Sequence, residues 1–232
     1  PSSAASDVYK RQVLANDGEL IFFGGNIGHP SQSLPEVLRE ANIDPAAVKS
    51  IEFTTKTSAN NISRAFVDLP ELQKVLKLGN LNYSGSTDSM FLSATNLEEI
   101  DLAGFDTSKI SSMEYMFFGI KASTLDVSKF DTSNVTNMRG MFDGASNLTS
   151  LDLSNFDTSK VTDMSYLFVK LSKITQIDVS SFNTSNVVSM AGMFDSVSNI
   201  SSLDLSNFDT SKVTDMNYMF LGAEKLEHLD IN

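Results

Sequence analysis

Six aspartates recur at nearly constant spacing through the second half of the sequence, each between two apolar residues. An aspartate flanked by apolar residues in a strand points away from the core, because successive side chains alternate between the two faces. Strands of neighbouring repeats would lie about 4.8 Å apart, so adjacent carboxylates would repel by roughly 0.9 kcal/mol in water. Something must offset that repulsion: hydrogen bonds from flanking Ser or Thr, a raised pKa, bound cations such as calcium, or direct contact with a ligand. The residues are Asp101, Asp126, Asp152, Asp178, Asp204 and Asp230.

A second column of short polar side chains precedes Thr-Ser in five repeats. One of them is Asn where the others are Asp, so the shared requirement is a short hydrogen-bond acceptor and not a charge. This pattern predicts an Asx turn or a helix N-cap, worth about 1 kcal/mol each. The column consists of Asp106, Asp131, Asp157, Asn183 and Asp209.

The sequence offers little for catalysis. It has no cysteine, and its two histidines are His29 and His228. It has no Gly-rich phosphate loop, no H-E-x-x-H and no G-x-S-x-G, and the calcium-binding repeat G-G-x-G-x-D is missing too. Acidic pairs abound, but an array that repeats every pair marks none of them as a catalytic site. We therefore expect no catalytic residues and no required cofactor, with calcium at the first aspartate column left open.

Charge and hydropathy exclude two classes of partner. The net charge is −12 with no basic stripe, which argues against nucleic acid and anionic membrane surfaces. No apolar run approaches the 18 or so residues of a membrane helix. Lack of cysteine also excludes a disulfide framework and Cys-ligated metal sites.

The elements that position these side chains are repeats. The stretch LDLSNFDTSKVTDM at 151–164 returns unchanged at 203–216, and the intervening unit is a close variant of it. Such a unit cannot bury its apolar face alone and must stack on its neighbours, so its strands form a parallel sheet. The repeats begin at Ile100, Leu125, Leu151, Ile177, Leu203 and Leu229.

Within one repeat the apolar residues change period. They alternate around LDL, as in a strand, and then recur at Val161, Met164, Leu167 and Phe168, as along a short helix. All ten Met residues fall in two repeat positions, which predicts core packing in preference to a copper site. The expected fold is an α/β repeat solenoid with one short strand and one short helix in each unit of about 26 residues.

One apolar position alternates between a large and a small residue. A Tyr ring leaning over the Gly of the next unit would fill space that two adjacent rings would contest. Such interdigitation explains why near-identity returns every second unit, and duplication of a two-unit block explains it equally. The position reads Tyr115, Gly140, Tyr166, Gly192 and Tyr218.

Composition divides the chain into four segments. Residues 1–12 match nothing downstream and resemble translated sequencing-adaptor sequence, so we exclude them from the fold. Residues 13–50 form a capping region, with a strand in 18–25 and a helix over 33–42 that begins with a Ser33–Glu36 capping box. Two degenerate repeats then occupy 51–99. Five regular repeats and the start of a sixth fill 100–232.

The unit LDLSNFDTSKVTDMSYLF resembles the 26-residue repeat of the BspA-like leucine-rich repeat proteins of bacterial surfaces. The match covers 100–232, and 18–99 looks like the degenerate lead-in of that family. The resemblance implies a leucine-rich-repeat-like solenoid, exported to the cell surface and often acting as an adhesin. Phe156 departs from the ordinary leucine-rich repeat, which has an Asn ladder at this position.

Three functions follow as hypotheses. The first is a non-enzymatic, extracellular binding module on a bacterial cell surface, an adhesin for protein or glycan on host or neighbouring cells. The second is a structural stalk that projects another domain, and the third is a glycan-acting enzyme. A binding module should vary from repeat to repeat on one face, whereas a stalk should be uniform.

Overall fold

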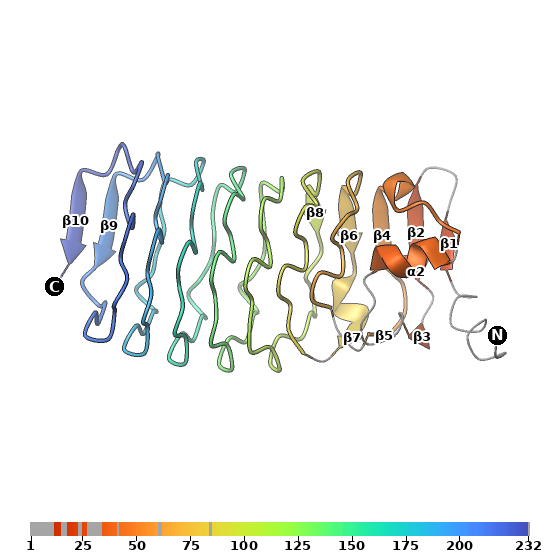
Figure 1. Cartoon of the computed structure of the whole chain (residues 1–232), viewed down its shortest axis with the longest axis horizontal. Coiled ribbons are helices and arrows are strands. Elements are labelled where there is room, and N and C mark those ends of the chain that lie inside the picture. The colour runs from red at the N-terminus through yellow and green to blue at the C-terminus, as the bar shows by residue number, and fades with distance from the viewer. Residues whose placement is uncertain are drawn as a thin grey trace.

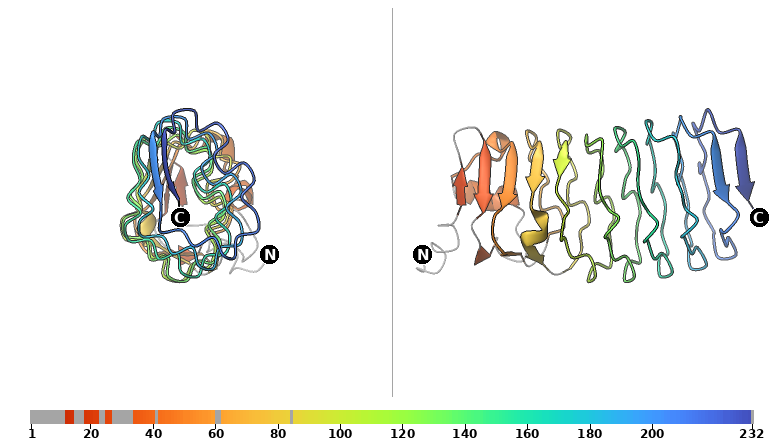
Figure 2. Two further views of the ribbon diagram at one scale, coloured as in Figure 1. Left: turned by 90° about the vertical axis from the view of Figure 1, so that its left-hand side faces the viewer. Right: turned by 180° about the vertical axis from the view of Figure 1, so that it is seen from behind.

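The computed structural model describes residues 12–14, 18–22, 25–26, 34–40, 42–59, 62–83 and 85–231. The chain winds into a parallel β-solenoid whose coils stack side by side along a nearly straight axis (Figure 1). Viewed along that axis, successive coils superimpose (Figure 2). Residues 1–11 of the suspected adaptor segment lie outside the described residues, as does Ser33 of the expected capping box.

The strands form three sheets. β1 (Gln12–Leu14) pairs antiparallel with β2 (Glu19–Phe22), and β2, β4 (Ser50–Phe53), β6 (Lys74–Leu76) and β8 (Glu99–Ile100) continue that sheet in parallel. A second parallel sheet contains β3 (Gly25–Asn26), β5 (Thr57–Ala59) and β7 (Leu81–Tyr83). At the other end β9 (Ser202–Leu205) pairs in parallel with β10 (His228–Ile231). Parallel pairing follows because each coil returns in the direction of the preceding one.

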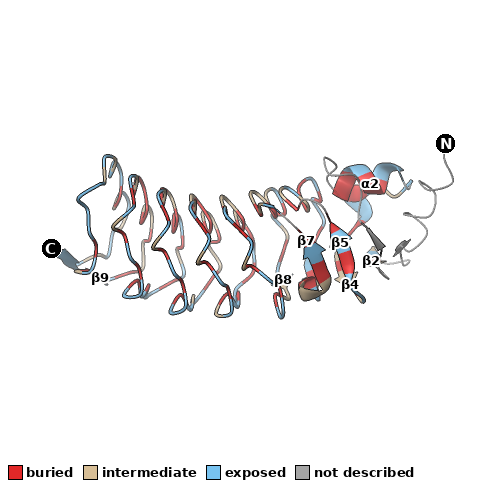
Figure 3. Ribbon diagram, turned by 90° about the horizontal axis from the view of Figure 1, so that it is seen from below, coloured by how far each residue is buried: buried red, intermediate tan, exposed pale blue. Residues whose placement is uncertain are grey.

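Short helices lie near the N-terminus. The helix expected over 33–42 is present as α2 (Leu34–Glu40), which buries Leu34, Val37 and Leu38 and exposes its other face (Figure 3). Two 3₁₀ turns, η1 (Pro45–Ala47) and η2 (Leu78–Asn80), connect the first coils. No described helix is long and apolar enough to cross a membrane.

Aromatic and Met ladders fill the core, as the repeat positions predict. Phe117, Phe142, Phe168 and Phe194 stack with ring centroids 5.6–6.1 Å apart, within the range of favourable aromatic pairs. The Met columns are buried in the same cluster through most of the array. The continuous core therefore links every coil to the next.

The short helix predicted for each repeat is not present among the described coils, and that prediction was wrong. Tyr166 and Lys170 both have φ near +59°, a left-handed conformation that a helix does not contain. Alternate amides instead bond to the following coil: Tyr166 N–H donates to Ala191 O at 2.8 Å and Phe168 N–H to Met193 O at 3.0 Å. Residues three and four apart still face the core through these turns, so their apolar spacing imitates a helix.

The Tyr/Gly alternation is a packing arrangement. A Cβ atom on Gly140 would overlap the ring of Tyr115, and one on Gly192 would lie 2.6 Å from Cδ1 of Tyr166. The backbone has positive φ at the tyrosines as well as at the glycines, so conformation does not select glycine here. The neighbouring ring does. We call 100–124, 151–176 and 203–228 Tyr-type coils, and 125–150 and 177–202 Gly-type coils.

Lys and Asn alternate with the same two-coil period. Lys160 Nζ donates to Asn134 Oδ1 of the preceding coil at 2.8 Å, and Lys212 Nζ donates to Asn186 Oδ1 at 2.7 Å. Alternation keeps lysines two coils apart, where like charges repel less. A second column alternates in the same way: Asn96, Lys121, Asn147, Lys173, Asn199 and Lys225.

The Gly140→Ala substitution tests the interdigitation. It should destabilise the fold by about 1–3 kcal/mol through contact with the Tyr115 ring, in addition to the cost of a left-handed alanine. Gly119→Ala is the matched control, since Gly119 has φ of +68° but no atom within 4 Å of its would-be Cβ. Equal losses of unfolding free energy in urea would show that the ring does not select glycine.

Candidate binding face

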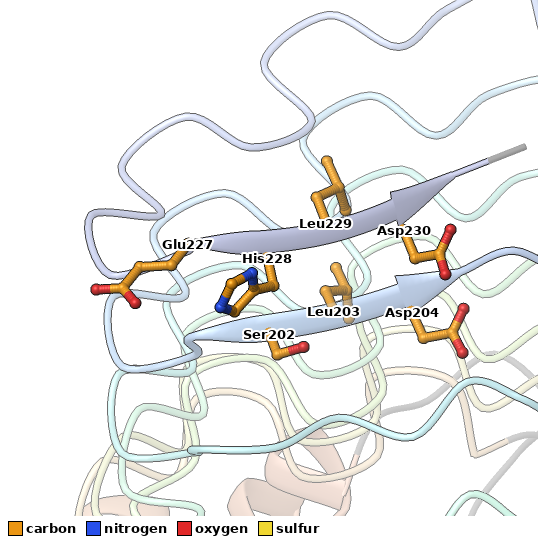
Figure 4. A pocket seen from close by; sticks show the side chains of 7 residues that line it. All are labelled: Ser202, Leu203, Asp204, Glu227, His228, Leu229 and Asp230. Atoms are coloured by element: carbon orange, nitrogen blue, oxygen red, sulfur yellow. The ribbon is translucent and has the colours of Figure 1, made fainter.

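The first aspartate column lies along one side of the solenoid, where each strand segment ends. Five of its members are exposed and Asp101 is partly buried. Asp204 and Asp230 are directly paired in the β9–β10 register, and their carboxylates lie side by side (Figure 4). The column thus has the outward position expected from the alternation of apolar residues.

Five of the six carboxylates in this column, those from Asp101 to Asp204, accept a hydrogen bond from the backbone two residues later. Asp152 Oδ1 accepts from the Ser154 N–H at 3.1 Å and from the Ser154 hydroxyl at 2.6 Å. This Asx turn redirects the chain at the end of the strand segment. The equivalent amide bonds join Asp101 to Ala103, Asp126 to Ser128, Asp178 to Ser180, and Asp204 to Ser206.

The serine bonds outweigh the repulsion between carboxylates. The side-chain hydrogen bond from Ser128, followed by its backbone hydrogen bond, lowers the pKa of Asp126, and the neighbouring Asp152 has the smallest effect. The same two serine bonds lower the pKa of Asp152, Asp178 and Asp204. Among the described residues, no three His, Asp or Glu side chains are grouped to hold a metal ion. Hydrogen bonds from the flanking serines are therefore one of the interactions that offset the repulsion between neighbouring carboxylates.

The second column forms Asx turns as well. Asp157 Oδ1 accepts from the Ser159 N–H at 2.9 Å, and Asn183 Oδ1 accepts from the Ser185 N–H at 3.0 Å. Asn therefore reproduces the geometry without the charge, as the Asp-to-Asn exchange in the sequence predicts. No helix follows these residues, so the N-cap alternative is wrong.

A third column of Asx-like turns was not predicted. Asp163 Oδ1 accepts from the Ser165 N–H at 2.8 Å, and Asp215 Oδ1 accepts from the Asn217 N–H at 3.0 Å. These acceptors directly precede the first Met of each repeat, and that fixed place was the available signal. The column comprises Asn137, Asp163, Ser189 and Asp215, which are also bridged from coil to coil.

Buried threonines join the coils from within. Thr158 Oγ1 donates to Asn183 O at 2.9 Å and accepts from the Asn183 N–H at 2.8 Å, so one hydroxyl satisfies two backbone groups of the next coil. Thr107, Thr132 and Thr184 make the same pair of bonds. All four are at most 2% exposed. This explains the constant Thr after each Asp or Asn, to which the sequence pattern alone gave no separate role.

Arg139 covers the tyrosine rings. Its Nε donates to the Tyr115 hydroxyl at 3.1 Å, and its guanidinium lies 4.9 Å from the Tyr166 ring centroid. Tyr166 also contacts Gly192 on the next coil. The rings are therefore packed between coils and are not flat platforms for a ligand.

A second outward column runs beside the first aspartate column. Its residues are exposed and differ from coil to coil without following the two-coil alternation: Glu99, Thr124, Ser150, Gln176, Ser202 and His228. Glu99 pairs with Lys74 at 2.8 Å, whereas the other five make no side-chain hydrogen bond within the described part of the chain. At the C-terminal end, Ser202, Asp204, His228 and Asp230 line a shallow groove of about 510 Å³ (Figure 4). We call these two columns the candidate binding face.

Partial burial raises the pKa of one aspartate that lies outside the candidate binding face. Burial raises the pKa of Asp143 to about 6, Lys170 lowers it, and Asp195 raises it further. Asp143 follows the two-coil alternation, since the equivalent residues of adjacent coils are Phe118 and Val169. The change of residue type at this position from coil to coil therefore reflects coil packing.

Thr158→Val tests the internal ladder. Valine has the same shape but leaves the buried N–H and carbonyl of Asn183 without a partner, which should cost about 2 kcal/mol or more. Thr162→Val is the control, because Thr162 is exposed and the equivalent position already carries Val188. Urea unfolding should separate the two variants, and similar stabilities would contradict the ladder's role.

The double variant Asp152→Asn, Asp178→Asn tests what stabilises the aspartate column. A lowered pKa in the folded state adds stability that is present above the unfolded pKa and is lost as pH falls through the folded pKa. Wild type should therefore be more stable than the variant near pH 7, and the difference should shrink as pH falls below about 4, the ordinary pKa of Asp. A variant more stable than wild type near pH 7 would show that repulsion dominates.

Calcium provides the second arm of that test. With hydrogen bonds as the stabilising interaction, calcium chloride and sodium chloride at equal ionic strength should shift the melting temperature equally. A rise specific to calcium that the double variant abolishes would instead identify a cation site.

Comparison with known protein families identifies a family to which the repeats belong. A family model described as "Mycoplasma protein of unknown function, DUF285" matches residues 60–176, 85–200 and 147–232. Comparison with curated protein sequences finds no match. The three family matches overlap and together cover more than half of the chain, including all the regular coils. The chain therefore belongs to the DUF285 family of Mycoplasma proteins of unknown function.

Proposed function

We propose that this chain is a non-enzymatic binding module, displayed outside the cell on a bacterial surface, that adheres to protein or glycan on host or neighbouring cells. The resemblance of LDLSNFDTSKVTDMSYLF to the BspA-like repeat supports the surface location. The candidate binding face is the part of the solenoid that we propose contacts the partner.

The column from Glu99 to His228 carries this proposal. Most outward columns are accounted for by contacts between coils: Asp and Ser by Asx turns, Lys and Asn by their mutual bonds, Tyr and Gly by packing. The column at Thr124, Ser150 and Gln176 is exposed and variable, with side-chain donors and acceptors that no described residue engages. Variation on one face distinguishes a binding module from a uniform stalk.

Charge restricts the partner. The variable column lies beside exposed aspartates, which are ionised at neutral pH because the ordinary pKa of Asp is about 3.9. Serine bonds lower the pKa of Asp152 and Asp204 further. With a net charge of −12 on the whole chain, the face suits neutral or cationic groups, such as the hydroxyls of a glycan or a basic segment of protein. It does not suit nucleic acid or anionic lipid.

A structural spacer is the second candidate, and the straightness of the stack favours it (Figure 1). Each coil would add about 4.8 Å of length. Internal ladders that join successive coils make such a rod stiff. A spacer requires no ligand, so binding measurements distinguish it from the first proposal.

The test is to measure binding of the whole chain to glycan and host-protein arrays, followed by variants at the candidate face. Thr124→Lys with Gln176→Lys places two cations, two coils apart, in the variable column. Binding should weaken about tenfold or more, because the added charge and bulk disturb the contact.

Thr136→Lys with Val188→Lys is the matched control, with the same charge change at exposed positions of another column. It should bind like wild type. Equal loss in both pairs would reject the candidate face, and a chain that binds nothing on either array would favour the spacer.

A further inference from the structure

Arg139, on a Gly-type coil, is held by the Tyr-type coils on either side of it. Its Nε donates to the Tyr115 hydroxyl at 3.1 Å and lies 3.9 Å from Glu114 Oε1. Its guanidinium lies 4.9 Å from the centroid of the Tyr166 ring, and Nη1 lies 3.9 Å from Asp163 Oδ2. A hydroxyl, a ring face and two carboxylates therefore hold one planar cation between successive tyrosines.

The following pair of Tyr-type coils repeats this arrangement without the arginine. The backbone register is the same, since the Tyr115 N–H donates to Arg139 O and the Tyr166 N–H donates to Ala191 O, both at 2.8 Å. The equivalents of the hydroxyl, the ring, the aspartate and the arginine are Tyr166, Tyr218, Asp215 and Ala191, and we call these four residues the Ala191 site.

The polar groups of the Ala191 site have unused capacity. Within the described residues the Tyr166 hydroxyl makes no hydrogen bond, and the Asp215 side chain accepts only from the Asn217 N–H, through Oδ1. Tyr166 and Asp215 are partly exposed, whereas Ala191 is buried and its methyl group is too short to occupy the position of a guanidinium. The site thus offers a hydroxyl and a carboxylate oxygen to a ligand from outside the coil.

A cation at this site is compatible with the stacking of the coils. Tyr166 already packs against Gly192 and lies beside the Arg139 guanidinium, so the two kinds of contact coexist on one ring. The ligand would enter between rings, as Arg139 does, and would not need a flat platform. One difference makes the Ala191 site weaker than its counterpart: Ser165 replaces Glu114, which leaves one carboxylate where Arg139 has two.

We propose that the Ala191 site binds the guanidinium of an arginine side chain on a partner protein. Its planar shape lets it lie against the Tyr218 ring while its N–H groups donate to the Tyr166 hydroxyl and to Asp215 Oδ2. A lysine ammonium is a compact point charge without a planar face, so it matches these groups less well. The net charge of −12 favours the approach of a cation. This inference concerns other columns than the candidate binding face, so either proposal can fail without the other.

Titration of the whole chain with N-acetyl-arginine amide, which represents an arginine within a polypeptide, tests the site. The ring resonances of Tyr166 and Tyr218 in NMR spectra should shift and saturate. N-acetyl-lysine amide at the same ionic strength should bind about threefold more weakly or worse. Ala191→Arg fills the site from within and should abolish the saturable shift, and its fold should be intact because Arg139 is accommodated at the equivalent position.

Two further variants complete the test. Arg139→Ala vacates the equivalent site and should add a second saturable site, seen at the Tyr115 ring. Tyr166→Phe keeps the ring on Gly192 but removes the hydroxyl, which should weaken binding about tenfold because a hydrogen bond to a charged group is lost.

Three results would overturn the proposal. The first is a wild-type chain without a saturable shift, and the second is an unchanged shift in Ala191→Arg. The third is an equal response to the arginine and lysine amides, because that response would be ordinary ionic screening.

Discussion

In a solenoid each side chain lies next to the equivalent side chain of the neighbouring coil, one strand spacing away. This contact between like residues is favourable for some groups and costly for others. Phenylalanine rings stack on their own kind, and a threonine hydroxyl can both donate to and accept from the next coil. Carboxylates, ammonium groups and tyrosine rings would clash with their own copies or repel them.

The chain handles the costly residues in two ways. Aspartates can be repeated in successive coils because the carboxylates from Asp101 to Asp204 accept local hydrogen bonds, as Asp152 does from Ser154. Lysine and tyrosine have no such local partner, so they occur in every second coil, with asparagine or glycine between them. Several columns share this two-coil period, and the identical stretches at 151–164 and 203–216 are both parts of Tyr-type coils. Packing thus gives a physical reason for the period, whether or not duplication also produced it.

The same constraint explains which features of the structure could be predicted from the sequence. Period, core ladders and the Tyr/Gly contact are properties of columns, and aligned repeats display columns directly. The prediction of a helix in each repeat was wrong because the apolar spacing at Val161, Met164 and Phe168 is common to a helix and to a pair of left-handed turns. In addition, a tyrosine in the sequence does not indicate a positive φ. The buried role of Thr158 was hidden because a threonine after an aspartate looks like an ordinary turn residue. The third acceptor column mixes Asn, Asp and Ser, so no single residue type revealed it.

The proposed binding function depends on the columns whose side chains are not used in stacking the coils. A ligand that displaced a Lys, Tyr or Asp side chain would compete with bonds that join or turn the coils, as at Lys160, Tyr166 and Asp152. Within the described structure, the side chains of Thr124, Ser150 and Gln176 make no hydrogen bond that joins or turns the coils. The residue types at these positions also do not follow the two-coil alternation. Residues there could be exchanged at little cost to the fold, since surface substitutions away from special contacts usually alter stability by less than about 0.5 kcal/mol. In the proposed function, a rigid repeat scaffold thereby presents adaptable side chains on this column, next to aspartates whose pKa the flanking serines lower.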